Sequence, residues 1–316
     1  MATAAMAGAT TPARAQATRP FRVGYASIGG SPQAPQYVAF ADRLRELGWD
    51  DRRMVVDAVF LAGDVSRYDG VMKEMVARGA DVLIAGGPEV ALRAALAASD
   101  RVPVVMSAFD FDPIGRGYVT GLARPDGRIT GLYVQQIELA EKRAELATEL
   151  FPGLRRATLL WDEASRDQAQ ATLAIAPRLG FEVASVELAT RPYDYAGALD
   201  RLGPGSRQPL LVPNSPTFFF DRDTLARLGL DRRLPTVFAW RDWVTAGGLM
   251  SYGPRLADMN RRVADYVDRL ARGARVADLP IEQPARIELV VNQRTARAIG
   301  VEIPPTLLAR ADEVIE

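Results

Sequence analysis

The stretch GADVLIAGGPEVALRAALAASDRVPVVMSAFD, residues 79–110, is the part of the chain that decides the fold class. Two short apolar runs, Val82–Ala85 and Val104–Ser107, flank a segment at 89–98 that is rich in alanine and leucine. Gly86-Gly87-Pro88 ends the first run and separates it from that segment. A strand, a helix and a second strand within about thirty residues predict a βαβ unit with parallel strands.

The same alternation continues on both sides of this unit. Upstream, the apolar spacing predicts strands at 21–27 and 54–60 and helices at 37–47 and 66–78. Downstream, a loose stretch at 109–128 is rich in glycine and proline, and the alternation then restarts. Further strands are expected at 129–134, 157–161, 182–188, 210–212 and 236–239, and further helices at 138–150, 168–179, 195–202 and 224–228.

Two short segments, one on each side of this loose stretch, are similar enough to indicate an internal repeat. RVPVVMSAFD at 101–110 aligns with RLPTVFAWRD at 233–242, about one lobe further along. We therefore predict an α/β protein of two Rossmann-like lobes with parallel sheets, joined by a hinge that the chain crosses several times. The first lobe is expected at 21–130 and the second at 131–252. Residues 253–316 would supply a crossover helix, the hinge return and a C-terminal tail that packs on the lobes.

The first twenty residues differ from the rest of the chain. MATAAMAGATTPARAQATRP is rich in alanine and threonine and has no acidic residue and no apolar periodicity. Ala13-Arg14-Ala15 and Ala15-Gln16-Ala17 match the small-x-small pattern of signal-peptidase sites. We interpret residues 1–20 as the remnant of an export signal, which predicts a periplasmic protein. The alternative is a disordered leader on a cytosolic protein.

The composition excludes several classes of function. The 39 basic and 39 acidic side chains balance, so a nucleic acid is not an expected partner. The chain has no cysteine and no histidine, which excludes thiolate nucleophiles, Ser-His-Asp catalysis and metal sites built on those residues. No apolar run has the length of a membrane-spanning helix. We expect no cofactor, no metal and no catalytic residue.

Ligands of open parallel sheets bind beyond the carboxyl ends of the strands, so the residues that follow each expected strand are the candidate site. Hydroxyls, aromatic rings, glycines and a few carboxylates gather there, as in a cleft for a small molecule. The candidate ligand-binding residues are Ser27, Gly86, Gly87, Ser107, Phe109, Asp110, Asn214, Ser215, Trp240, Asp242 and Tyr252.

Each candidate also has a purely structural alternative. Gly86-Gly87 could present amides to a ligand carboxylate or simply form a tight turn. The aromatic residues could be packing, and the loop aspartates could be Asx turns or helix caps. Asn214-Ser215 could be a plain turn before Pro216.

Several motifs, in one order along the chain, resemble those of a known family. They are DPIG at 112–115, LARPDGRITG at 122–131, GLMSYGP at 248–254, DLPIEQP at 278–284 and IPPTLLARADEVI at 303–315. The chain resembles the bacterial ABC-transporter substrate-binding protein family that includes the tryptophan/tyrosine-binding proteins. That resemblance implies a type I periplasmic-binding-protein fold with three hinge crossings and a ligand in the cleft. It also implies delivery to a membrane permease, no catalysis, and aromatic amino acids as the known ligands.

The leading hypothesis is an exported solute-binding protein for an aromatic amino acid or another small carboxylate or aromatic compound. Its partner would be an inner-membrane ABC permease, with only peripheral contact with the membrane complex. Ser27, Ser107, Ser215 and the Gly86-Gly87 amides would hold a carboxylate. Phe109, Trp240 and Tyr252 would cover an apolar body, and Asp110 or Asp242 would pair with an amine. The alternatives are a cytosolic ligand sensor of the same fold and an α/β isomerase or racemase.

Overall fold

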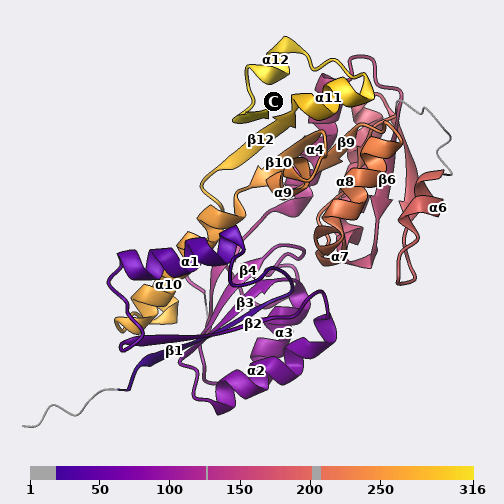
Figure 1. Cartoon of the computed structure of the whole chain (residues 1–316). Coiled ribbons are helices and arrows are strands. Elements are labelled where there is room, and N and C mark those ends of the chain that lie inside the picture. Colours follow the sequence, from indigo (N-terminus) through magenta and orange to yellow (C-terminus); the bar gives the residue numbers. More distant parts are fainter. Residues whose placement is uncertain (1–18, 126, 201–207) are drawn as a thin grey trace, which may run out of the picture.

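The computed structural model describes residues 19–125, 127–200 and 208–316, which form two α/β lobes (Figure 1). The expected leader, apart from its last two residues, lies outside the described residues, as does the end of the helix expected at 195–202. Among the described residues, no helix combines the length and the apolar character that a membrane-spanning segment needs.

The first lobe is built on a six-stranded sheet in the order β11-β5-β4-β3-β1-β2. Every pairing in it among the described residues is parallel. Its strands are β1 (Phe21–Ser27), β2 (Met54–Phe60), β3 (Val82–Gly87), β4 (Val104–Ala108), β5 (Ile129–Tyr133) and β11 (Ile281–Glu282). Its helices are α1 (Pro35–Glu46), α2 (Tyr68–Ala77), α3 (Glu89–Ala98) and α10 (Leu256–Ala271), with short 3-10 turns η1 (Val65–Arg67) and η4 (Val276–Asp278).

Strand β3 shows why helices cover both faces of this sheet. Successive side chains of a strand point to opposite faces. Val82 and Ile84 pack in the core shared with α1 and α10, whereas Leu83 and Ala85 pack in the core shared with α2 and α3. A strand buried on both faces needs a continuous apolar run, which is the pattern seen in the sequence.

The second lobe is built on a seven-stranded sheet in the order β13-β12-β10-β9-β8-β6-β7, in which only β10 and β12 pair antiparallel among the described residues. Its strands are β6 (Arg156–Trp161), β7 (Glu182–Glu187), β8 (Leu210–Leu211), β9 (Thr236–Phe238), β10 (Met250–Pro254), β12 (Ile287–Asn292) and β13 (Glu313–Ile315). Its helices are α4 (Gln136–Leu150), α5 (Arg166–Ile175), α6 (Tyr195–Asp200), α7 (Pro216–Phe220), α8 (Arg222–Asp231), α9 (Arg241–Thr245), α11 (Gln293–Ile299) and α12 (Pro305–Leu308), with 3-10 turns η2 (Glu163–Ser165) and η3 (Ala176–Leu179).

The chain passes between the two lobes three times. It crosses from β5 to α4, from β10 to α10 and from β11 to β12. The predicted architecture of two α/β lobes with several crossings is therefore confirmed. The boundary expected at residue 130 falls inside β5, which pairs with β4 along its whole length, so the first sheet extends to Tyr133.

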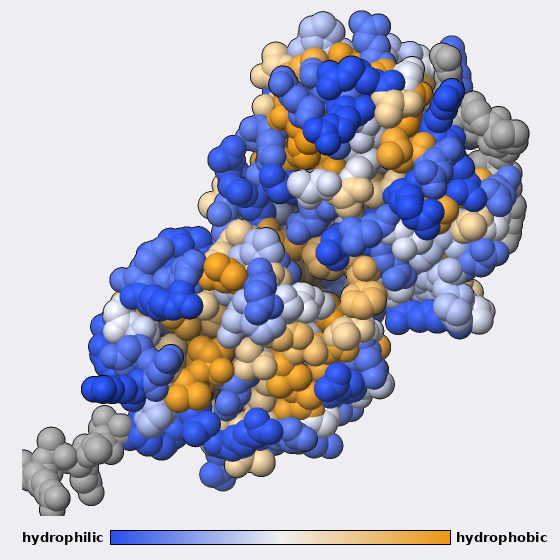
Figure 2. Space-filling view, viewed as in Figure 1, coloured by the Kyte–Doolittle hydropathy of each residue, from blue (hydrophilic) through white to orange (hydrophobic). Residues whose placement is uncertain are grey.

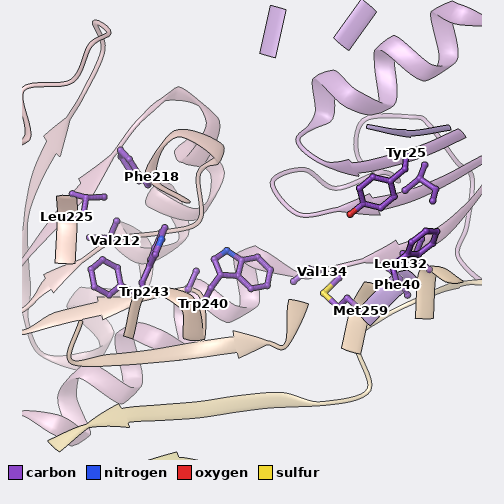
Figure 3. Packing of buried hydrophobic residues seen from close by; sticks show 14 of the residues in the cluster. Tyr25, Phe40, Leu132, Val134, Val212, Phe218, Leu225, Trp240, Trp243 and Met259 are labelled. Atoms are coloured by element: carbon purple, nitrogen blue, oxygen red, sulfur yellow. The ribbon is translucent and has the colours of Figure 1, made fainter. Parts of the chain in front are cut away.

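One apolar cluster reaches from one lobe into the other. Figure 3 shows Tyr25, Phe40 and Met259 on the first lobe and Trp240, Trp243 and Phe218 on the second, with Val134 between them. Val134 lies in the first crossing, directly after β5. The hinge region is thus packed with side chains of both lobes.

Two short helices after strands of the second lobe were not expected from the sequence. Helix α7 begins at Pro216, where Ser215 caps it by accepting a hydrogen bond from the Thr217 amide at 3.2 Å. Helix α9 follows Trp240. Both are too short to show a helical period in the sequence, and both lie close to the cleft.

Candidate functional site

A cavity lies between the lobes and has about 720 Å³ of empty space, including its open mouth. Figure 2 shows apolar residues where the two lobes meet. Eight of the eleven candidate residues from the sequence line this cavity. They are Ser27, Gly86, Gly87, Ser107, Phe109, Asp110, Asn214 and Trp240.

The floor of the cavity on the first lobe is a row of three small residues on neighbouring strands. The register pairs Ser27 of β1 with Gly86 of β3, and Gly86 with Ser107 of β4. A Cβ atom placed on Gly86 would meet no other atom within 4 Å. The missing side chain therefore leaves room for a ligand between the two serines.

The aromatic walls come from both lobes. Phe109 follows β4 and Trp240 follows β9, and their ring centroids lie 5.4 Å apart with the planes tilted by 54°. Asn214 holds both residues: its Nδ2 donates to the Phe109 main-chain oxygen at 3.0 Å, and its Oδ1 accepts from Trp240 Nε1 at 2.6 Å. The apolar wall is thus fixed by polar contacts behind it.

Asn214 is itself held by a buried network in the second lobe. Gln168 donates from Nε2 to the Asn214 main-chain oxygen at 2.8 Å and accepts from the Asn214 amide at 2.9 Å. Arg143 donates to Gln168 Oε1 at 3.2 Å, to Gln136 Oε1 and to the Tyr252 main-chain oxygen. Burial lowers the pKa of the Arg143 guanidinium to about 9, because the charge loses its water.

Asp110 is the carboxylate that faces the cavity. Its Oδ1 accepts a 3.0 Å hydrogen bond from the amide of Glu89, the first residue of α3. Burial raises the pKa of Asp110 to about 7, and the nearby carboxylates of Glu89 and Asp162 add to the rise. Asp110 also borders a smaller polar cavity, which Gln136 and other residues line.

Three of the candidate residues do not line the cavity. Ser215 donates from Oγ to Asp162 Oδ2 at 2.5 Å and caps α7. Asp242 lies in the first turn of α9 and borders a separate groove at the rim, beside Phe220 and Arg222. The Tyr252 side chain packs against the core of the second lobe. Ser215 and Asp242 come after β8 and β9 as expected, but Ser215 caps α7 and Asp242 lies in the first turn of α9. Tyr252 was expected to follow a strand and instead lies inside β10, where its side chain points to the core of the lobe.

The cavity is also lined by residues that the sequence did not indicate. Tyr25 and Asn260 meet through a 3.1 Å hydrogen bond from the tyrosine hydroxyl to the Asn260 Oδ1. Asn260 was detectable in principle as a lone amide on the apolar face of a long amphipathic helix. Tyr25 lies inside β1, whereas ligand-binding residues were expected only beyond the carboxyl ends of the strands. The other unpredicted lining residues are Ile28, Gly29, Gln36, Ile84, Pro88, Pro216, Phe219 and Leu256.

The site offers no metal-binding set. Within the described ranges, no group of three or more carboxylates is placed to hold a metal ion. The cavity presents hydroxyls, amides, aromatic faces and one carboxylate, which together can orient a small organic molecule.

Comparison with known proteins adds an independent line of evidence. Residues 32–315 match the sequence model of a family described as ABC transporter substrate binding protein. The chain is 20% identical over 267 residues to the "Tyrosine-binding protein" of Clostridioides difficile (strain R20291). The aligned region covers 83% of this chain and 76% of that protein.

Solved structures share the fold. One is an ABC domain from Streptococcus pneumonia in complex with L-Trp, with a TM-score of 0.82 and 24% identity over 94% of this chain and 100% of that chain. Another is a conserved domain protein from Vibrio cholerae, with a TM-score of 0.83 and 20% identity over 94% of this chain and 100% of that chain.

Proposed function

The chain belongs to the ABC transporter substrate-binding protein family, and from this premise we propose that it is an exported solute-binding protein that delivers a small molecule to an inner-membrane ABC importer. Its fold is the type I periplasmic-binding-protein fold. Family members bind small molecules and work with ABC permeases rather than transform a substrate. The expected absence of catalysis by this chain is part of the proposal.

The observation that carries the proposal is the cavity between the lobes, because each lobe supplies one of its walls. Ser27, Gly86 and Ser107 come from the first lobe, whereas Asn214 and Trp240 come from the second. A ligand that contacts both walls favours the closed arrangement of the lobes over an open one. The three crossings are the places where such a hinge motion would occur.

The ligand we propose is an aromatic amino acid or another small carboxylate or aromatic compound. Phe109, Trp240 and Phe219 provide an apolar surface for its body. The Ser107 hydroxyl and the Gly86-Gly87 amides would be neutral donors for a carboxylate, and the Ser27 hydroxyl would join them by turning away from the Gly29 main-chain oxygen, to which it donates at 2.8 Å. The printed names of two relatives agree with this class, since one is a tyrosine-binding protein and another was solved with L-Trp.

Two measurements on refolded, ligand-stripped protein test this function. A thermal-shift screen of amino acids, aromatic acids, dicarboxylates and nucleosides identifies the ligand, since a ligand at about 100 times its Kd adds about 2.7 kcal/mol to stability. Small-angle X-ray scattering with that ligand should show a smaller radius of gyration. A tight ligand that leaves the radius unchanged would contradict hinge closure.

Localisation is tested separately. We propose that the mature protein acts outside the cytoplasm, as substrate-binding proteins of this family generally do. Fractionation of the cells in which the protein naturally occurs should place it in the periplasmic fraction. Retention in the cytoplasm would favour a ligand sensor of the same fold.

A further inference from the structure

We propose that Phe220 is a positioning residue for the bound solute: from outside the cavity, its ring holds the second lobe against Gly29 and Gly63 of the first lobe and so slows solute release. We call this contact of Phe220 with the two glycines the rim contact. The proposal rests on the proposed function, because release has a meaning only if the cavity holds a solute. It adds a residue outside the cavity to those that determine how tightly a solute is held.

The rim contact joins the two lobes. Phe220 is the last residue of α7, on the side of the second lobe that faces the first lobe (Figure 1). Gly29 follows β1 and Gly63 follows β2, both in the first lobe. A Cβ atom placed on Gly63 would lie 3.3 Å from Cγ and Cδ1 of the Phe220 ring, and one placed on Gly29 would lie 4.0 Å from Cδ2. The ring therefore packs where neither residue has a side chain that would push it away.

The two glycines belong to one continuous surface of the first lobe. The Gly63 amide donates to the Ile28 oxygen at 2.7 Å, and the Leu61 amide donates to the Ser27 oxygen at 2.9 Å. These hydrogen bonds join the loop after β1 to the loop after β2. Gly63 has a φ of +85°, a left-handed conformation that glycine adopts without steric cost. The backbone thus requires glycine at a position where a side chain would also crowd the Phe220 ring.

Three consecutive phenylalanines of α7 have different surroundings. Phe218 is fully buried in the second lobe, with its ring edge-on to Tyr193 and Tyr195. Phe219 lines the cavity, whereas Phe220 lines the groove at the rim and is 48% exposed. Successive residues of a helix point about 100° apart, so one turn reaches the core, the cavity and the first lobe together. When Phe220 leaves the glycines, Phe219 therefore leaves the cavity mouth with it.

Both ends of α7 are fixed to the second lobe. Before the helix, the Ser215 Oγ donates to the buried Asp162 Oδ2 at 2.5 Å. After the helix, the Tyr195 hydroxyl donates to the Asp221 Oδ2 at 2.7 Å. Helix α7 therefore moves with the second lobe, and the rim contact exists only while the lobes are together.

The rim contact is expected to act on solute release and not on solute entry. A solute enters while the lobes are apart, when the rim contact is broken. It leaves only after the lobes separate and the Phe220 ring returns to water, which costs free energy in proportion to the apolar area exposed. Affinity changes that arise in this way lie in the dissociation rate.

Stopped-flow tryptophan fluorescence tests this role, because Trp240 lies in the cavity wall. The probe is L-tyrosine or, if it does not bind, the most stabilising compound of the thermal-shift screen. Phe220→Ala should raise the dissociation rate constant about fivefold, as for a half-buried ring, and change the association rate constant by no more than about twofold. An unchanged dissociation rate constant, or an equal rise in both constants, would overturn the proposal.

Two variants separate the rim contact from a general loss of apolar surface. Phe220→Tyr keeps the ring, and its hydroxyl would extend from the ring edge opposite the atoms nearest Gly63, so both rate constants should match wild type. Leu173→Ala removes a side chain of α5 that is 37% exposed, on a groove whose described lining residues all belong to the second lobe. It should also leave both constants unchanged. A rise in the dissociation rate constant with Leu173→Ala as large as with Phe220→Ala would contradict the assignment.

A cross-linking experiment tests the rim contact without a solute. The chain has no cysteine, so Gly29→Cys and Phe220→Cys in one chain supply its only two thiols. A short thiol-reactive cross-linker should join these two within one molecule and should not join Gly29→Cys with Leu173→Cys. Failure to join positions 29 and 220 would overturn the proposal. A joined pair in a protein that binds no small molecule would instead show that the contact forms but that the proposed function, and with it the role in solute release, is wrong.

Discussion

The side-chain amide of Asn214 donates a 3.0 Å hydrogen bond to the main-chain oxygen of Phe109 and thereby joins the second lobe to the first across the cavity. The same side chain accepts from Trp240 at 2.6 Å. Arg116 and Asp167 form a second link between the lobes, at 3.4 Å. The arrangement of the lobes seen here therefore has polar contacts of its own, and a ligand that touches both walls would add to them.

Asn214→Asp tests the first of these contacts. The substitution places a carboxylate oxygen where an amide nitrogen now faces the Phe109 oxygen, at a residue only 4% exposed. We expect a weaker closed state, seen as a larger radius of gyration in solution, and solute affinity reduced about tenfold, since a buried unsatisfied group costs about 1–3 kcal/mol.

Asn292→Asp is the matched control for that experiment. Asn292 is similarly buried, donates to the Val244 oxygen at 3.1 Å and accepts from the Thr295 amide at 2.9 Å, all within the second lobe. It should lose stability without a change in lobe closure. An equal change of radius in both variants would show that Asn214 has no special role in closure.

Gly86→Val tests whether the cavity is the binding site. The new side chain would enter open space at Gly86, between Ser27 and Ser107, and fill the floor of the cavity. We expect loss of solute binding with a melting temperature within a few degrees of wild type. Gly70→Ala, in α2 and also without neighbours within 4 Å, should keep full binding. Solute binding by Gly86→Val at wild-type affinity would place the site elsewhere.

The raised pKa of Asp110 predicts that this residue lowers the unfolding free energy of the ligand-free protein as the pH rises. The folded pKa of about 7 lies above the unfolded value of about 3.9. Between these values the folded state holds a proton at Asp110 that the unfolded state has released, so the contribution of Asp110 to stability falls as pH rises from about 4 to 7.

Asp110→Asn should remove this fall. At pH 8 the variant should be more stable than wild type by about 1–4 kcal/mol, given about 1.4 kcal/mol for each unit of pKa, and near pH 4 the two should agree. Urea unfolding across this range measures the difference. A variant less stable than wild type at pH 8 would mean that the carboxylate stabilises the empty cleft.

Arg143→Met tests the network that supports the wall. Arg143 is only 4% exposed and donates to Gln136, Gln168 and the Tyr252 oxygen, so its loss removes the donor to the buried Gln136 Oε1 and one of the two donors to Gln168 Oε1. We expect unfolding free energy to fall by about 1–3 kcal/mol and solute affinity to fall as well, because Gln168 positions Asn214.

The control for Arg143→Met is Arg227→Met, which removes an exposed arginine paired with Asp231 four residues along the same helix. Its effect should stay within about 0.5 kcal/mol, with normal binding. Equal losses of unfolding free energy and solute affinity in the two variants would contradict the role of the buried Arg143 network in supporting the cavity wall.

The sequence predicted the fold and part of the site because both depend on local patterns. Apolar runs of central strands such as β3 and β4 are buried on both faces, and residues at the carboxyl ends of neighbouring strands meet at one edge, which brought Ser27, Gly86 and Ser107 together. Tyr25 and Asn260 could not be paired in this way, because α10 returns to the first lobe only after most of the second lobe, more than 200 residues beyond β1. Ser215 was misplaced because its hydroxyl caps a helix too short to predict.

The most direct test of the central claim is a thermal-shift measurement of ligand-stripped wild type and Gly86→Val against the same panel of aromatic amino acids and amines. We predict that at least one of these compounds raises the melting temperature of wild type and leaves that of Gly86→Val unchanged. The account would be contradicted if every stabilising compound acted equally on both proteins, or if none acted on wild type and no small molecule co-purified with it.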